Sequence, residues 1–229
     1  MFARHGLSRR TTITLMIAAA ALAGAPIHGA TARQADRSTA DRPYQIYLLK
    51  GLADVFSSGM DFLQAKLRAR GIAGEVHSHT EWEELAQSAI AKWHHGSHGP
   101  IIIIGHSLGG DAAVQMSEKL GSAGVPVALV VTFSPTETLP VNGNVAHAVN
   151  YWLSNSNFHG RITRGAGFHG TLETVDLARS PGVGHFNIEK MDSLHAATIA
   201  RVMSLVSNHA RAGAPETQAD GDKAAASSQ

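Results

Sequence analysis

Apolar runs and amphipathic stretches alternate along the middle of the chain. Short apolar or β-rich runs predict six strands, at 44–49, 75–78, 100–104, 127–132, 146–153 and 171–176. Stretches with apolar residues at helical spacing predict four helices, beginning near 58, 80, 108 and 190. Strands that are apolar throughout and alternate with helices indicate an α/β protein, with a mostly parallel sheet covered by helices on both faces.

The apolar run 101–104 leads directly into the sequence Gly-His-Ser-Leu-Gly at 105–109, which matches the pattern G-x-S-x-G. In such a turn between a strand and a helix the serine is held in a strained conformation, and glycines flank it because a side chain would collide with neighbouring backbone. A plain strand-to-helix turn would also account for the glycines. The apolar strand before the motif and the alanine-rich helix after it favour Ser107 as a nucleophile, with His106 packed beside it.

From Tyr44 to His209 the chain resembles the α/β-hydrolases, and Gly-His-Ser-Leu-Gly-Gly is the form of the motif common in their lipases, esterases and thioesterases. The resemblance implies a serine hydrolase that cleaves a carboxylic ester or thioester of a small molecule through an acyl-enzyme. It implies no cofactor. No segment is long enough for a cap domain, so a small member of about six strands is expected.

A serine nucleophile needs a general base, and in the resembled family the chain order is serine, acid, histidine. His185 lies in the glycine-rich segment 181–186, between the last predicted strand and the final helix, where the family places its base. His195 and His209 fall in and at the end of the final helix, where we expect them at the surface.

The sequence offers more than one candidate for the acid of the triad. Ser134 stands after the strand 127–132, where related lipases often carry an aspartate. We expect Asp176, nine residues before His185 at the end of the last strand, to orient the histidine. Glu137, or a serine–histidine dyad oriented by Ser134 or by the backbone, are alternatives.

Two backbone amides are needed to bind the oxyanion. The resemblance assigns the first to Leu108, directly after Ser107. The second is expected from Leu52, because Gly51 permits a turn at the end of the first strand that aims this amide at the site. Ala53 is the alternative donor.

Composition narrows the function further. The formal net charge is +1 and no cysteine is present, so a basic nucleic-acid surface, disulfides and thiolate metal sites are not expected. The cluster His94-His95-Gly96-Ser97-His98 contains no carboxylate, and its glycine marks a helix end, so we expect no metal site there. The oligomeric state is left open.

The N-terminal residues have the order of a secretory signal peptide. Basic residues at 4–10 precede a short apolar run at 13–25, and small residues at 30–32 offer a cleavage site. The pair Arg9-Arg10 also resembles a twin-arginine export signal. The apolar run is too short to span a bilayer. We therefore expect a periplasmic or secreted protein with no stable membrane insertion after cleavage.

The expected organisation is a signal peptide at 1–32, a linker at 33–42, a hydrolase domain at 43–209 and a disordered, polar tail at 210–229. One functional alternative has to be kept. Because Ser134 stands where an acid is common, the chain could be a non-catalytic binding protein with a degraded triad.

Overall fold

The computed structural model describes residues 42–52, 58–158 and 160–213. The predicted signal peptide, nearly all of the predicted linker, and the tail from residue 214 onward lie outside these ranges. The last helix reaches Ala212, beyond the domain end predicted at residue 209. No helix in the described part of the chain is long and apolar enough to cross a membrane.

Six parallel strands form the main sheet, in the order β2-β1-β3-β4-β6-β8. This confirms the predicted α/β class and the predicted sheet. The strands are β1 (Gln45–Lys50), β2 (Glu75–Ser78), β3 (Ile101–His106), β4 (Val127–Phe133), β6 (Val145–Trp152) and β8 (Thr171–Asp176).

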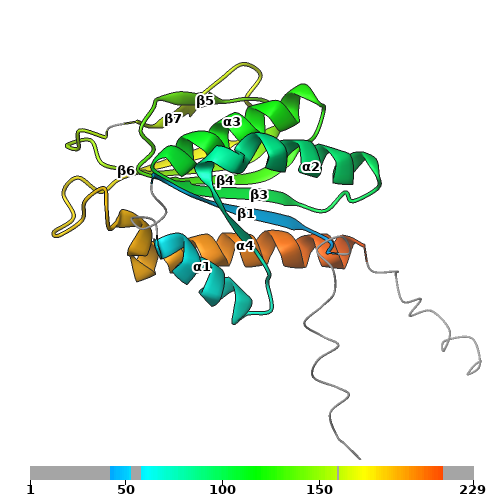
Figure 1. The fold of residues 1–229 in the computed structure, drawn as a ribbon, viewed down its shortest axis with the longest axis horizontal. Coiled ribbons are helices and arrows are strands. Elements are labelled where there is room, and N and C mark those ends of the chain that lie inside the picture. The colour runs from blue at the N-terminus through cyan, green and yellow to red at the C-terminus, as the bar shows by residue number, and fades with distance from the viewer. Residues whose placement is uncertain (1–41, 53–57, 159, 214–229) are drawn as a thin grey trace, which may run out of the picture. The chain divides into compact units, whose positions relative to one another are not determined.

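Helices cover both faces of this sheet, as predicted (Figure 1). On one face lie α2 (Trp82–His94) and α3 (Leu108–Ser122), and on the other α1 (Ser58–Arg68) and α4 (Asp192–Ala212). The two faces have separate hydrophobic cores.

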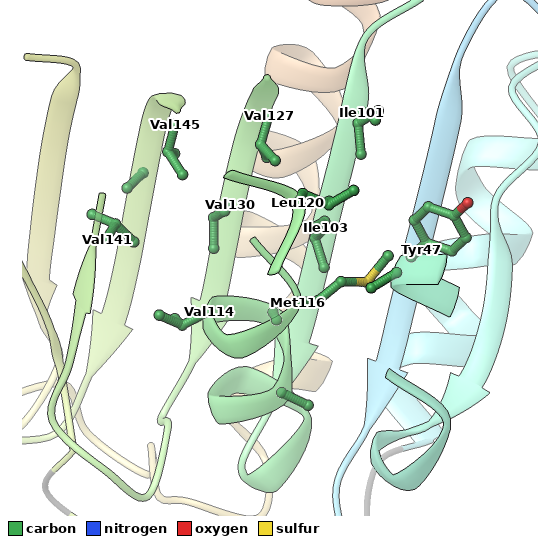
Figure 2. Packing of buried hydrophobic residues seen from close by; sticks show 14 of the residues in the cluster. Tyr47, Ile101, Ile103, Val114, Met116, Leu120, Val127, Val130, Val141 and Val145 are labelled. Carbon is green, nitrogen blue, oxygen red and sulfur yellow. The ribbon is translucent and has the colours of Figure 1, made fainter. Parts of the chain in front are cut away.

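The four consecutive isoleucines of β3 supply both cores. Ile101 and Ile103 belong to the cluster with α2 and α3, and Ile102 and Ile104 belong to the cluster with α1 and α4. Successive side chains of a strand point to opposite faces, so a central strand covered on both sides is apolar at every position. Figure 2 shows Ile103 among Met116, Leu120 and Tyr47 on the first face.

Local sequence left two features unpredicted. A second sheet contains the parallel strands β5 (Leu139–Val141) and β7 (Ile162–Arg164), which are too short to show an alternating pattern. The other is the capping box before α2, which joins Ser78 and Glu81, with the Glu81 carboxylate accepting from the Ser78 amide at 2.9 Å. A short 3₁₀ turn, η3 (His79–Glu81), therefore precedes α2.

We expect Ile103→Ala to lower the free energy of unfolding by about 2–5 kcal/mol, because it leaves a cavity in a fully buried strand. Ile103→Val should cost about 0.5–1.5 kcal/mol. Urea unfolding followed by circular dichroism measures both, with the partly exposed Met203→Ala on α4 as the control. An Ile103→Ala chain as stable as the control would contradict the burial of this strand.

Candidate active site

Ser107 occupies a strained turn between β3 and α3. Its backbone angles are φ 57° and ψ −128°, and its amide donates a hydrogen bond to the carbonyl of Phe133 at 3.0 Å. A Cβ atom at Gly105 would lie 1.9 Å from the carbonyl oxygen of Gly109, and one at Gly109 would lie 2.1 Å from that of Leu49. Both flanking positions therefore require glycine. This is the geometry predicted from the motif, with the serine at the carboxyl edge of the sheet.

His185 reaches Ser107 from the loop that follows β8. The Nε2 atom of His185 lies 3.0 Å from Ser107 Oγ, and both side chains are buried. The Ser107 hydroxyl can donate to Nε2 if the ring proton resides on Nδ1. The structure thus brings together the two residues that the sequence paired as nucleophile and base.

Ser134 holds the other nitrogen of the ring. Its Oγ lies 2.8 Å from His185 Nδ1, so in the tautomer that accepts from Ser107 the Nδ1–H group donates to Ser134. Ser134 is fully buried and has a φ of 45°, which non-glycine residues rarely adopt. The residue that stands where relatives often carry an acid therefore contacts the histidine directly.

Asp176 does not contact the ring, and the prediction that it orients His185 is wrong. Its carboxylate accepts hydrogen bonds from the Ser154 hydroxyl at 2.6 Å, the Ser154 amide at 3.1 Å and the Ala178 amide at 3.0 Å. These bonds, the Ser154 hydroxyl first, hold the pKa of Asp176 below its usual value. The predicted acid serves to fix the start of a loop.

Sheet order gives the physical reason. His106 pairs with Phe133, so Ser107 and Ser134 occupy equivalent positions just beyond the neighbouring strands β3 and β4. Asp176 ends β8, the edge strand, and pairs with Trp152 of β6. Two strand spacings, about 10 Å, separate β4 from β8. Because β4 is a direct neighbour of β3 and β8 is not, Ser134 lies closer to Ser107 than Asp176 does.

The loop that carries Ser134 is tied to the helix that follows Ser107. Asp111, buried in the first turn of α3, accepts hydrogen bonds from the amides of Thr136 at 2.9 Å and Glu137 at 3.0 Å, and from the Thr136 hydroxyl. Burial raises the pKa of Asp111. Sequence reasoning missed this residue, although an aspartate in an alanine-rich buried helix was a signal. Glu137, the alternative acid, is exposed and is held through its backbone.

His106 ties down the base from the other side. Its Nε2–H donates to the backbone carbonyl of His185 at 2.8 Å, and the two rings lie 5.1 Å apart. Burial lowers the pKa of His106 to about 4, so the ring is neutral at pH 7. His106 does more than pack beside the site, since it sets the backbone position of the residue that contacts Ser107.

A cavity of about 670 Å³ opens over Ser107 and His185. Its other lining residues are Leu52, His106, Leu108, Thr136, Phe158 and Phe186. None of the described residues that line it carries an Asp, Glu, Lys or Arg side chain. Leu108 and Leu52, the predicted oxyanion donors, both lie at this cavity; their amides remain predicted donors. The alternative donor, Ala53, lies outside the described residues.

Among the described residues, no histidine other than His106 and His185 lines this cavity. His195 was expected at the surface but is fully buried, and its Nε2–H donates to the carbonyl of Glu189 at 2.6 Å. His209 is exposed, as predicted. His98 packs edge-on against Trp93 at 4.6 Å. Within the described ranges, no group of three His, Asp or Glu side chains is placed to hold a metal ion.

A parallel six-stranded sheet, helices on both faces, a strained serine between β3 and α3, and a histidine after the last strand occur together here. The chain has an α/β-hydrolase-like fold. This fold supports many activities, so function has to be argued from the site.

Comparisons with solved structures find distant likeness. No protein-family model matches the chain, and no curated protein matches it. A solved structure of a Xanthomonas campestris pv. campestris protein assigned to the alpha/beta superfamily of hydrolases is similar, at 16% identity and TM-score 0.44, over 73% of this chain and 99% of that one.

Two solved thioesterase structures show a similarly low identity and TM-score. Human thioesterase 2 has 12% identity and a TM-score of 0.47, with 76% of this chain and all of that chain covered. The type II thioesterase BorB from the borrelidin biosynthetic cluster has 12% identity and a TM-score of 0.41, with 69% and 92% covered. Likeness at this level does not transfer an activity.

We expect His185 to stay neutral until the pH falls to about 4, because burial disfavours its charged form. An unfolded histidine titrates near 6.5. The unfolded chain therefore binds more protons below about pH 6.5, so the stability contribution is complete above that pH and is lost as the pH falls through about 4. NMR titration of the ring measures this pKa, with His185→Gln identifying its resonance. A midpoint near 6.5 would contradict the burial of the ring.

Proposed function

We propose that this protein is a serine hydrolase that cleaves a carboxylic ester or thioester through an acyl-enzyme on Ser107. The observation that carries the proposal is the 3.0 Å contact between Ser107 Oγ and His185 Nε2 at a strained strand-to-helix turn under an open cavity. A serine in such a place needs a base within hydrogen-bond reach to become a nucleophile, and it has one.

In the proposed reaction Ser107 Oγ attacks the acyl carbon while His185 Nε2 takes the hydroxyl proton. The carbonyl π electrons move to oxygen, and the tetrahedral intermediate collapses as its bond to the leaving group breaks. The imidazolium returns the proton to the departing alcohol or thiol. Water, deprotonated by the same nitrogen, then attacks the acyl-enzyme, and the imidazolium returns the proton to Ser107 Oγ as the acyl–oxygen bond breaks and the acid is released. The amides of Leu108 and Leu52 would bind the oxyanion, helped by the N-terminus of α3.

Ser134 has a limited role in this mechanism. Its Oγ accepts from Nδ1–H at 2.8 Å and so keeps the proton off Nε2, which must be free to accept from Ser107. A hydroxyl carries no charge, so it orients the ring without the electrostatic stabilisation that an aspartate gives to the imidazolium. Three side chains are therefore arranged as in a catalytic triad, but the third, Ser134, carries no charge.

The lining of the cavity favours a substrate with an uncharged, apolar acyl group. Leu52, Phe158 and Phe186 present apolar surface around Ser107, and no described lining residue could pair with an anionic group of the substrate. We therefore propose an uncharged ester or thioester of a small molecule. No nucleic acid partner and no cofactor is proposed.

A second candidate is a non-catalytic binding protein. It is favoured by Ser134, because a hydroxyl in place of the acid is what loss of catalysis would leave. The retained contact between Ser107 and His185 and the strained turn favour the hydrolase, since neither is needed to bind an apolar ligand.

We also propose that the protein is exported, to the periplasm or the medium. The support is the basic, apolar and small-residue order of residues 1–32, which lie outside the described ranges.

We expect a fluorophosphonate probe to label Ser107, and Ser107→Ala to abolish both labelling and the hydrolysis of p-nitrophenyl esters. Peptide mapping of the labelled, folded protein measures this. Ser117→Ala, at a buried serine inside α3, is the matched control and should label like the natural chain. Folded natural protein that is neither labelled nor active would reject the hydrolase and leave the binding protein.

We expect Ser134→Ala to lower kcat/KM by about 10- to 100-fold, because it leaves a buried Nδ1–H group without an acceptor, at a cost of about 1–3 kcal/mol. Asp176→Asn should lower it by less than about 5-fold, since only exposed hydrogen bonds are weakened. Steady-state kinetics with a p-nitrophenyl ester compares the two. A larger loss for Asp176→Asn than for Ser134→Ala would restore Asp176 as the acid.

A further inference from the structure

Phe158 lies flat against the ring of His185. The two ring centroids are 4.0 Å apart and the planes are inclined by 21°, whereas the Phe186 ring is nearly perpendicular to the same histidine, at 5.0 Å and 88°. Phe158 is 39% exposed, so this large apolar side chain is kept at the surface of the molecule instead of in its core. Such a position suggests a part in the site.

In the proposed reaction the His185 imidazolium needs stabilisation, which this contact can supply. When Ser107 is deprotonated, His185 becomes a cation inside a buried, apolar surrounding, where charge is costly. The described hydrogen-bond partners of its ring are two hydroxyls, Ser107 and Ser134, and neither is charged. The ring of His106 lies 5.1 Å away, and its protonation would only oppose that of His185.

An aromatic face attracts a cation because the π system places negative charge above and below the ring, while the ring edge is positive. Phe158 offers its face to His185 in a stacked arrangement, whereas the Phe186 ring stands nearly perpendicular to the histidine. We propose that Phe158 is a positioning residue that stabilises the His185 imidazolium through its ring face and so takes over part of what a carboxylate does in a charged triad. This inference rests on the proposed function.

The fold holds Phe158 in place from both ends of its loop. On one side the Asp176 carboxylate binds the amide and the hydroxyl of Ser154, and the Phe158 amide donates to Ser156 Oγ at 3.0 Å. On the other side Gly160 lies against the loop after β4, so close that a Cβ atom would stand 2.4 Å from the amide nitrogen of Glu137.

Asp111 binds this loop after β4 by accepting from the Thr136 and Glu137 amides. The loop after β4 therefore both carries Ser134 and helps to position the loop of Phe158. The residue predicted to act as the acid contributes to the site at a distance, because Asp176 anchors the loop that brings Phe158 to His185.

The test compares Phe158→Leu, which keeps an apolar cover and removes the π face, with Phe158→Trp, which keeps an aromatic face. We expect Phe158→Leu to lower kcat for p-nitrophenyl acetate by roughly 3- to 30-fold, and Phe158→Trp to retain most of the rate. The acetyl group is small, so loss of acyl binding affects this substrate least. Phe62→Leu, the same change at an exposed position on α1, is the control and should leave the rate unchanged.

A second measurement does not depend on turnover. In NMR titrations of the folded proteins, Phe158→Leu should lower the pKa of His185 and Phe158→Trp should not, because the aromatic face favours the charged form. If Phe158 only excluded water, Phe158→Leu would match the natural chain in rate and pKa, and the proposal would be overturned. Equal losses in both variants with an unmoved pKa would show a packing role and overturn it too.

Failure of the proposed function would be recognised separately. In that case the natural chain would show no labelling of Ser107, while the NMR comparison would still show whether Phe158 stabilises the imidazolium. If Ser107 is labelled and active in the natural chain and Phe158→Leu has no effect, only this inference fails.

Discussion

The site depends on one shared side chain, the imidazole of His185, held at both nitrogens by serines from neighbouring strands. Ser107 and Ser134 stand at equivalent positions beyond β3 and β4, each with a positive φ, and the ring lies between their hydroxyls at 3.0 and 2.8 Å. Because parallel strands end at one edge of the sheet, adjacent strands can offer two side chains to one histidine. Any change that moved the register of β4 against β3 would separate them.

This arrangement is neutral where a charged triad would carry an aspartate, and the surroundings of the ring reflect that. The ring is buried, it is neutral at pH 7, and its polar partners are uncharged. Protonation of the ring in the proposed reaction is therefore costly. The proposed aromatic stabilisation by Phe158 and the proposed uncharged acyl substrate both fit these neutral surroundings.

Asp111 and Asp176 bind loops of the site and make no contact with the His185 ring. Asp111 binds the loop after β4, which carries Ser134, and Asp176 binds the loop after β6, which carries Phe158. Carboxylates accept several backbone amides at once, so they are well suited to fix irregular segments whose amides have no strand partner. The rigid sheet sets the positions of the strand ends, and these two side chains extend that rigidity into the loops.

The sequence by itself determined the fold class, the strands of the main sheet and the serine turn, because these rest on local patterns: apolar runs, helical spacing and two glycines that steric contact requires. It also determined His185, through its place after the last strand. It did not determine the partner of that histidine. Asp176 and Ser134 both end strands, and only the order β3-β4-β6-β8 decides which of them lies beside Ser107. That order, and with it the stacking of Phe158, follows from contacts between residues far apart in the chain, which no local pattern records.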